Sequence, residues 1–283
     1  MRWLYHLTRG DDLVRGPEGF VHCSWASDLA ETRRLHYANV SERDLRLIRV
    51  DPRRVADVRV EGPRSMPHVY GEIARDAWSL EEMDRAPDLV TGTKFVVVGF
   101  ARMTLLDLVG VLDPLGRIVT MDVDREASIE VVSATEEKWS GFGADFSAKR
   151  TRPPLDAFDV LVVAGGPETR ALEHDPKVVE WLRAFPANRM ATSVCTGALL
   201  LGAAGRLRGK RATTHHASLD LLAKHGATAV PQTRVVRDGQ LMTAGGVTSA
   251  MDLGLAIAQW LYGDEARARI AARMEYPAAP LPS

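Results

Sequence analysis

Cys195 stands between two short apolar stretches of different character. Residues 190–194 are mostly apolar or β-branched and predict a buried strand, and residues 197–204 predict a tightly packed helix. Ser193 and Gly197, the small residues two positions away on each side, suit the sharp strand-to-helix turn that holds a nucleophile. Unpaired N–H groups and the positive end of the helix favour a thiolate there. The pattern predicts a reactive thiol; the alternative is a small buried apolar residue that does no chemistry.

Three other segments carry groups that could act with this thiol. Asp107 is a lone acid among leucine and valine residues, and a carboxyl group removed from water needs a partner. Gly165 and Gly166 would let backbone N–H groups approach a reacting centre closely. His215 ends a run of polar residues after an expected strand. Each also has an ordinary explanation: a solvated surface acid, a turn after a strand, and a structural histidine.

The order of elements predicts how these segments meet. From Lys94 onward, apolar strand-like runs alternate with helical periodicity, which predicts a parallel sheet covered by helices on both faces. Ligands bind such sheets at the carboxyl ends of the strands, where Cys195 falls. The expected strands are residues 95–100, 117–123, 129–134, 160–164 and 190–194, and the expected helices are residues 104–115, 175–185, 217–225 and 248–261.

The first 86 residues have a character of their own. We expect strands at residues 3–8 and 45–50, and a helix at residues 27–37 with Ser27 as its N-cap. His6, His22, Ser24 and His68 predict a polar pocket in this part of the chain. The histidine spacing matches no zinc pattern, so we expect no metal, and a structural role for these histidines stays open.

Two domains are expected, a small α+β domain at 1–86 and a larger one at 94–283. Residues 81–93 between them are polar and broken by proline, as is typical of a linker. The whole chain has 283 residues, 46% of them apolar, which is enough for a sizeable core.

Composition narrows the possible partners. The formal net charge of −1 gives no field for holding nucleic acid or a membrane surface. The two cysteines lie far apart in sequence, so we expect no disulfide framework. The N-terminus does not read as a secretory signal, and no apolar run approaches the roughly 20 residues of a membrane span. We therefore expect a cytoplasmic protein with neither nucleic acid nor a membrane as a partner.

The segments around Cys195 resemble the ThiJ/PfpI superfamily, and within it the isonitrile (isocyanide) hydratases. The resemblance is carried by residues 106–110, 164–166, 192–197, 205–215, 235–239, 243–252 and 275–276. It implies a flavodoxin-like fold, similar to that of class I glutamine amidotransferases, and a homodimer. It also implies a hydratase that converts an isocyanide to an N-substituted formamide without a metal or organic cofactor.

The same resemblance implies roles for particular residues. Cys195 would be the nucleophile and Asp107 the general acid and base, with one proton shared between them. The Thr196 N–H and the loop of Gly165 and Gly166 would stabilise developing charge, and the Thr196 hydroxyl would position water or substrate. His215 would lie close to the substrate.

Departures from the family pattern keep other functions open. Thr196 stands where superfamily proteases have histidine, which argues against a protease, and Val111 and His216 differ from the usual hydratase residues. The alternatives are another cysteine enzyme of glyoxalase or amidase type, or a cysteine redox sensor. A third is a ligand-binding module in which the N-terminal domain carries the activity.

The N-terminal part resembles a bacterial family of unknown function, domain of unknown function family 952. The resemblance rests on residues 18–24, together with residues 5–8, 50–52 and 67–71. It implies a relationship to the ADP-ribosyltransferase fold and, through that, a nucleotide-like ligand.

Overall fold

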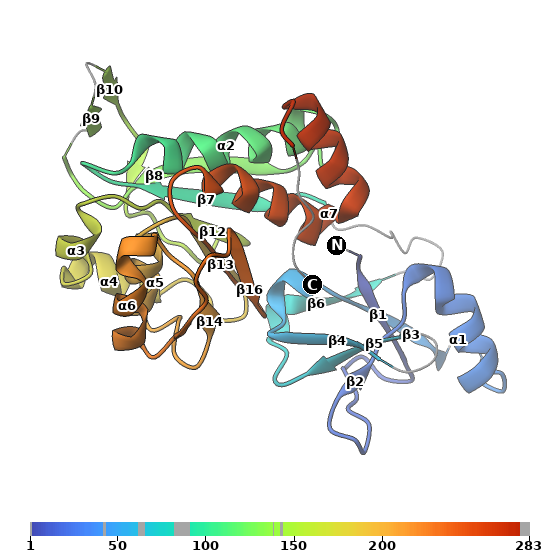
Figure 1. Ribbon diagram of the computed structural model, residues 1–283. Helices are drawn as coiled ribbons and strands as arrows, with labels where there is room; N and C mark the ends of the chain where they lie inside the picture. The colour runs from blue at the N-terminus through green and yellow to red at the C-terminus, as the bar shows by residue number, and fades with distance from the viewer. Residues whose placement is uncertain are drawn as a thin grey trace. The chain divides into compact units, whose positions relative to one another are not determined.

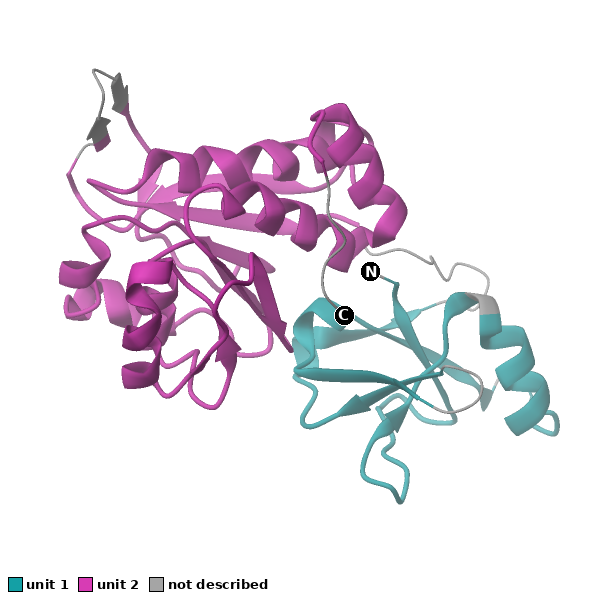
Figure 2. Cartoon of the chain, in the orientation of Figure 1, with its two compact units in different colours: residues 1–90 teal, residues 91–283 magenta. Residues whose placement is uncertain are grey.

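The computed structural model divides into two compact units, residues 1–90 and 91–283 (Figure 2). It describes residues 2–41, 44–61, 66–81, 91–137, 139–141 and 144–277. Residues 82–90, most of the expected linker, lie outside the described residues, and the domain limits 1–86 and 94–283 stay a prediction.

The described residues of unit 1 form two three-stranded antiparallel sheets and one α-helix (Figure 1). One sheet has the order β1-β3-β6 and the other β2-β5-β4. The elements are β1 (Leu4–Thr8), β2 (Val21–His22), α1 (Leu29–His36), β3 (Arg46–Val50), β4 (Asp57–Glu61), β5 (Met66–Tyr70) and β6 (Trp78–Glu81). Strand β1 is buried along its whole length, and Tyr5 within it bridges to Ser24, just after β2 in the other sheet.

The predicted N-cap of α1 is wrong. A single 3₁₀ turn, Ala26–Asp28, precedes the helix, and Ser27 lies inside that turn. The turn closes with a hydrogen bond from the Asp28 N–H to the Trp25 carbonyl, so the α-helix begins only at Leu29. Asp28 takes the N-cap position without a side-chain cap bond.

Unit 2 is built on a seven-stranded sheet with the order β11-β8-β7-β12-β13-β17-β16. All neighbours are parallel except β16 and β17. The strands are β7 (Lys94–Gly99), β8 (Ser128–Ser133), β11 (Arg150–Thr151), β12 (Val160–Val163), β13 (Met190–Ser193), β16 (Val235–Asp238) and β17 (Leu241–Ala244). Shorter strands are β9 (Trp139–Gly141), β10 (Ala144–Phe146), β14 (Arg211–Ala212) and β15 (Thr228–Ala229).

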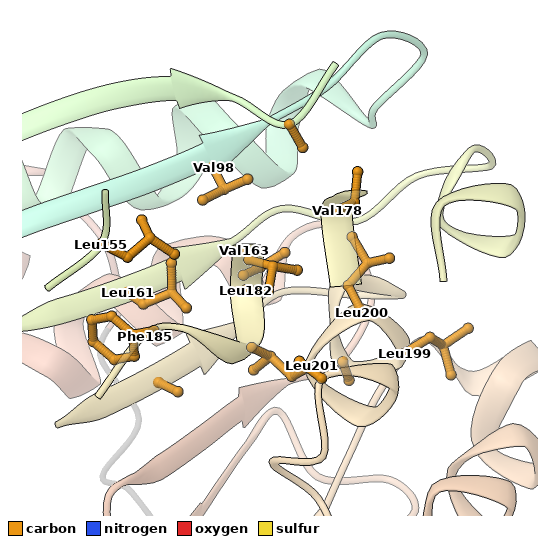
Figure 3. Close-up of a cluster of buried hydrophobic side chains, with 14 of the residues drawn as sticks. Val98, Leu155, Leu161, Val163, Val178, Leu182, Phe185, Leu199, Leu200 and Leu201 are labelled. Atoms are coloured by element: carbon orange, nitrogen blue, oxygen red, sulfur yellow. The ribbon is translucent and has the colours of Figure 1, made fainter. Parts of the chain in front are cut away.

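Helices cover both faces of this sheet, as predicted (Figure 1). One face carries α2 (Leu105–Thr120) and α7 (Ser249–Arg273), and the other carries α3 (Thr169–Leu172), α4 (Pro176–Arg183), α5 (Gly197–Ala203) and α6 (Leu219–Leu222). The central strands are apolar on both faces because both are covered. Figure 3 shows part of the core on the α4 and α5 side, where Leu161, Val163, Leu182 and Leu200 meet.

The predicted strand at residues 117–123 is wrong, because α2 continues through Thr120. Leu108, Val111, Leu115 and Ile118 are all buried, and their spacing of three and four residues keeps them on one helical face. The β-branched residues near 118 therefore extend an apolar helix stripe and do not form a strand.

The strand order reverses between β7 and β12. From β7 the chain first builds β8 and β11 on one side, then β12, β13 and β17 on the other. Loops at such a reversal diverge and leave a crevice at the carboxyl ends of the strands. The segments that carry Asp107, Gly165 and Cys195 directly follow β7, β12 and β13.

Candidate active site

Cys195 occupies a strained turn between β13 and α5. Its φ is +53°, a left-handed conformation that is uncommon for a residue with a side chain and typical of functional sites. Its N–H donates to the carbonyls of Gly245 at 2.9 Å and Ala244 at 3.1 Å, and its carbonyl accepts from Thr214 Oγ1 at 2.7 Å. The turn fixes the direction of the thiol before any ligand arrives.

Asp107 reaches this thiol from the first turn of α2. Its side chain is fully buried, and its Oδ2 accepts a hydrogen bond from the Gly165 N–H at 3.0 Å. Oδ1 is buried without a well-formed hydrogen bond to any described residue, although the Cys195 thiol lies close enough to interact with the carboxyl. The carboxyl thus has one oxygen fixed by the backbone and one available to the thiol or a ligand.

The electrostatics of this pair oppose ionisation of both groups. Burial raises the pKa of the Asp107 carboxyl to about 7, and the bonds from Gly165 and Cys195 offset only part of that rise. Burial and then the Asp107 charge raise the pKa of the Cys195 thiol. The expectation that the helix end would favour a thiolate is therefore corrected: burial and the neighbouring carboxylate outweigh that effect on the Cys195 pKa.

Gly165 packs where the elements of the site converge. A Cβ on Gly165 would lie 2.6 Å from the Thr196 nitrogen, 2.8 Å from Asp107 Oδ2 and 2.8 Å from Cys195 Cβ. Any side chain there would push apart the acid and the nucleophile. Glycine is thus a geometric requirement of the pair.

The N–H groups of the Gly165 and Gly166 loop, which we expected to stabilise developing charge, have partners within the protein, and the role of the loop stays a prediction. Both donate to the protein itself: Gly165 to the Asp107 carboxyl, and Gly166 to Thr196 Oγ1 at 2.9 Å. The Thr196 hydroxyl in turn donates to the Gly166 carbonyl at 3.0 Å. These bonds position the acid and tie the loop to the nucleophile turn.

The backbone N–H groups of Thr196 and Val247 bond to the thiol and lower its pKa, against the effect of burial. The sequence indicated the first of these, whereas we assigned no role to Val247. Val247 has φ of +27°, an outlier for a β-branched residue, and it directly follows Gly245 and Gly246. The glycine pair after an apolar strand was the sequence feature that could have indicated a backbone N–H close to the thiol.

His215 lies at the edge of the site and forms no hydrogen bond with the described Asp107 and Cys195 side chains. Its ring packs against Gly246, and its Nδ1 accepts a long bond of 3.3 Å from the Ala217 N–H. Burial lowers its pKa, so the imidazole is neutral near pH 7 and Nε2 carries the proton. His216 is exposed beside it, with ring centroids 4.3 Å apart. Val111 is fully buried in α2.

The four N-terminal residues singled out from the sequence come together in unit 1. His6, His22, Ser24 and His68 all line one cavity of about 610 Å³. His6 Nδ1 donates to the His22 carbonyl at 2.8 Å, and His22 pairs with His68 across β2 and β5. Within the described residues, no three His, Cys, Asp or Glu side chains are grouped as a metal site would require.

Each of the two units matches a different family of known proteins. A model of the DJ-1/PfpI family matches residues 96–259, more than half of the 283 residues, so the chain belongs to the DJ-1/PfpI family. A second model, described as a protein of unknown function (DUF952), matches residues 6–79. Both resemblances drawn from the sequence are confirmed.

Individual relatives differ in what they do. Isonitrile hydratase of Pseudomonas putida is 39% identical over 184 residues, covering 64% of this chain and 77% of that protein. The HTH-type transcriptional regulator CdhR of Pseudomonas aeruginosa is 34% identical over 115 residues, covering 40% and 34%. The crystal structure of a ThiJ/PfpI family protein from Pseudomonas syringae is 28% identical with a TM-score of 0.60, covering 75% and 84%. Family membership alone does not assign a reaction.

Within the part of the chain that the structure describes, no helix combines the length and apolar character needed to cross a membrane.

Proposed function

We propose that the chain is a cysteine-dependent hydratase that adds water to an isocyanide, R–N≡C, and releases an N-substituted formamide. The observation that carries this proposal is that Asp107 and Cys195 are both buried and lie side by side, and that the pKa of each group is raised. Similarity to isonitrile hydratase of Pseudomonas putida supports the substrate class.

The pair supplies the proton that the first step needs. Two acids in contact, neither of which ionises easily, hold one proton between them at pH values above the Asp107 pKa of about 7 and below the raised pKa of Cys195. With that proton on Asp107, Cys195 is a thiolate whose charge the Thr196 and Val247 N–H groups stabilise. Sulfur then bonds to the isocyanide carbon while Asp107 delivers its proton to the same carbon. The product is a thioimidate, R–N=CH–S–Cys195, and an Asp107 carboxylate.

The second step uses the carboxylate as a base. Asp107 takes a proton from water as the water oxygen bonds to the thioimidate carbon, and the nitrogen receives that proton. The C–S bond then breaks as the C=O bond forms, and the remaining hydroxyl proton returns to the pair. One isocyanide and one water give one formamide with no change in oxidation state, so the reaction requires neither a metal nor an organic cofactor.

The strained turn and the Gly165 contact suit this use of the pair. The carboxyl must stay within reach of the same carbon in both steps, first as a proton donor and then as a base. A carboxyl fixed through Oδ2 by the Gly165 N–H, with Oδ1 unengaged, keeps that position without rearrangement.

A redox-sensor function fits the site less well. Sensor cysteines combine a low pKa with exposure to solvent. Cys195 is 4% exposed and its pKa is raised. Another cysteine-dependent hydrolase or glyoxalase uses the same groups, so substrate tests must separate it from a hydratase.

The test is a panel of alkyl and aryl isocyanides and of dicarbonyl compounds, incubated with the full chain and with Cys195→Ala. Chromatography measures the formation of the formamide. Formamide should form from the isocyanides and not from the dicarbonyl compounds, and only when the wild-type chain is present. Turnover of a dicarbonyl without formamide from any isocyanide would replace this proposal with a glyoxalase-type reaction. Formamide from the alanine variant at the wild-type rate would remove Cys195 from the mechanism.

A further inference from the structure

Unit 1 contains a cavity that the hydratase proposal does not use. Its volume is about 610 Å³, within the range of sites that enclose a small molecule. Strand β1, helix α1, strand β5 and the segments before and after β2 all contribute to its lining. Figure 1 shows α1 lying beside the strands of this unit.

The lining is basic. Two arginines, Arg9 and Arg15, and four histidines line the cavity, and no Asp or Glu is among its described lining residues. Glu18 lies 3.7 Å from His22, and Glu61 lies 3.1 Å from His68. Among the described lining residues themselves, the permanent charges are those of the two arginines, and both are positive.

The two arginines differ in how firmly they are held. The Arg15 guanidinium donates to the Gly19 carbonyl at 3.0 Å and also to the Gly71 carbonyl, so it is fixed at the rim. Arg9 makes no ion pair with a described residue, and its charge acts on the neighbouring Tyr37, whose hydroxyl donates to the Leu7 carbonyl at 2.7 Å. Arg9 thus has its five N–H donors available to a ligand.

A buried hydroxyl adds an uncharged donor. Ser24 is 3% exposed, and its Oγ lies 2.9 Å from Oγ1 of Thr32, with both residues lining the cavity. Two hydroxyls that bond to each other use only one of their two hydrogens. The hydrogen of the accepting hydroxyl has no partner among the described residues, and it is a donor for a ligand oxygen.

His6 forms the floor of the cavity and does not carry charge. It is 6% exposed, and burial lowers its pKa. Its Nδ1–H donates to the His22 carbonyl at 2.8 Å, and its Nε2 accepts from the Val14 N–H at 3.3 Å. A neutral imidazole engaged on both nitrogens is part of the wall.

We propose that this cavity binds the phosphate group of a small organic phosphate ester. The guanidinium of Arg9 and the free hydroxyl hydrogen are donors that match phosphate oxygens, and a fork-shaped guanidinium binds phosphate through two parallel bonds. Leu7, Val14 and Met66 supply apolar lining for the organic group. A metal ion is a poorer fit because the described residues offer no group of three ligands.

Phosphate fits the cavity better than carboxylate because of the number of donors. A carboxylate has two oxygens and one charge, whereas a phosphate ester presents three unbridged oxygens and up to two charges. The cavity offers hydrogen-bond donors from two guanidinium groups, the hydroxyl pair and the exposed imidazoles. These donors are more than the two oxygens of a carboxylate can accept.

The test is isothermal titration calorimetry of the full chain at constant ionic strength. The probes are glycerol phosphate, inorganic phosphate and acetate. Glycerol phosphate should bind most tightly, inorganic phosphate more weakly, and acetate should give no saturable heat. Arg9→Gln should weaken glycerol phosphate binding by about tenfold or more, as loss of a charge-assisted bond predicts.

A matched control comes from the same unit. Arg34 lies on α1 two residues after Thr32, hence on the opposite side of the helix, and it does not line the cavity. Arg34→Gln should therefore bind glycerol phosphate as the wild type does. Arg9→Lys should bind with intermediate affinity, because it keeps the charge and loses the fork.

Several results would overturn the proposal. One is that neither phosphate gives saturable heat, and another is that acetate binds as tightly as glycerol phosphate. The others are that inorganic phosphate binds while glycerol phosphate does not, and that Arg9→Gln and Arg34→Gln lose the same affinity for glycerol phosphate. Circular dichroism of each variant checks that the chain remains folded. None of these outcomes bears on isocyanide hydration, which is measured separately at Cys195.

Discussion

The Asp107 carboxyl lies beside the Cys195 thiol although the two residues belong to different elements on opposite sides of β12. Asp107 comes from the first turn of α2, which follows β7, and Cys195 lies in the turn that follows β13. Strand β12 lies between those two strands, and the Gly165 N–H just beyond it donates to Asp107 Oδ2 at 3.0 Å. The segment after the central strand, β12, thus fixes the acid. The two neighbouring strands, β7 and β13, lead to the acid and to the nucleophile.

Substitutions at this pair test the proposed mechanism directly. Cys195→Ala should abolish formamide production, because no other described side chain at the site can attack the isocyanide carbon. Asp107→Asn should lower kcat by at least on the order of 10²-fold, since an amide cannot release a proton as a carboxyl does. Asp107→Glu should retain partial activity because it keeps the acid with a longer reach.

Steady-state kinetics on a reactive isocyanide, with thiol titration to show that Cys195 is intact, provide the measurement. Wild-type turnover by Asp107→Asn would make Asp107 a structural residue and exclude the two-step scheme.

The pH dependence of kcat/KM should be bell-shaped. The reactive form of the pair holds one proton, so activity should rise as the pair loses its first proton near the Asp107 pKa of about 7. It should fall at higher pH, as the pair loses its second proton at the raised pKa of Cys195. In Asp107→Asn the rising limb near pH 7 should disappear from the residual activity. A profile in which the variant keeps that limb would assign it to another group.

Local sequence patterns predicted the parts of the fold that depend on neighbours in sequence. The apolar run expected as a strand at 95–100 forms most of β7, and the small residues around Cys195 form the strained turn, because both depend on side chains within a few positions. The strand wrongly expected at 117–123 shows the limit. β-branched residues suited a strand, and only the surroundings of α2 show that Ile118 extends a buried helix stripe.

Other features depend on groups far apart in sequence. The target of the Gly165 N–H is a carboxyl from another element, and the Val247 N–H reaches the thiol from a loop after β17. The raised pKa of Cys195 follows from burial and from Asp107, neither of which a local pattern measures. The expected homodimer and cytoplasmic location concern partners and compartments that the fold of one chain does not fix, so they stay predictions.

Gly165→Ala should separate site geometry from site chemistry. The added methyl would meet the Thr196 nitrogen at 2.6 Å and Asp107 Oδ2 at 2.8 Å, so acid and nucleophile must move apart. A displacement of this kind should lower kcat by on the order of 10²-fold while Asp107 and Cys195 both remain. The rate of thiol modification at Cys195 should change too. An unaltered kcat would show that the segments carrying Gly165, Asp107 and Cys195 accommodate the methyl group without moving the acid away from the nucleophile.

Contact between α2 and α7 should matter for stability, because α2 carries Asp107 and α7 begins just after Val247. A Cβ on Gly254 would lie 2.2 Å from Pro114 Cγ, so Gly254→Ala should destabilise unit 2 by about 1–3 kcal/mol. A Cβ on Gly116 of α2 would meet no described heavy atom within 4 Å, so Gly116→Ala should stabilise the helix by about 0.5–1 kcal/mol. Urea unfolding compares the two; equal effects of the same sign would contradict the close packing.

Unit 2 should fold without unit 1, and its stability should depend on where the fragment starts. The buried Asp124 carboxylate accepts bonds from the Gly92 N–H at 2.9 Å and the Thr93 N–H at 3.1 Å, and the Tyr262 hydroxyl lies 2.8 Å from both Thr93 Oγ1 and Asp124 Oδ2. A fragment of residues 91–283 keeps these bonds, whereas residues 94–283 lack the Gly92 and Thr93 donors and leave Asp124 with the Glu126 N–H and the Tyr262 hydroxyl. Both should be folded, with the shorter less stable by about 1–3 kcal/mol, the cost of removing hydrogen bonds from a buried carboxylate. Chemical denaturation followed by circular dichroism measures the difference. If neither fragment folds while the full chain is stable, the two units depend on each other and the expected boundary fails.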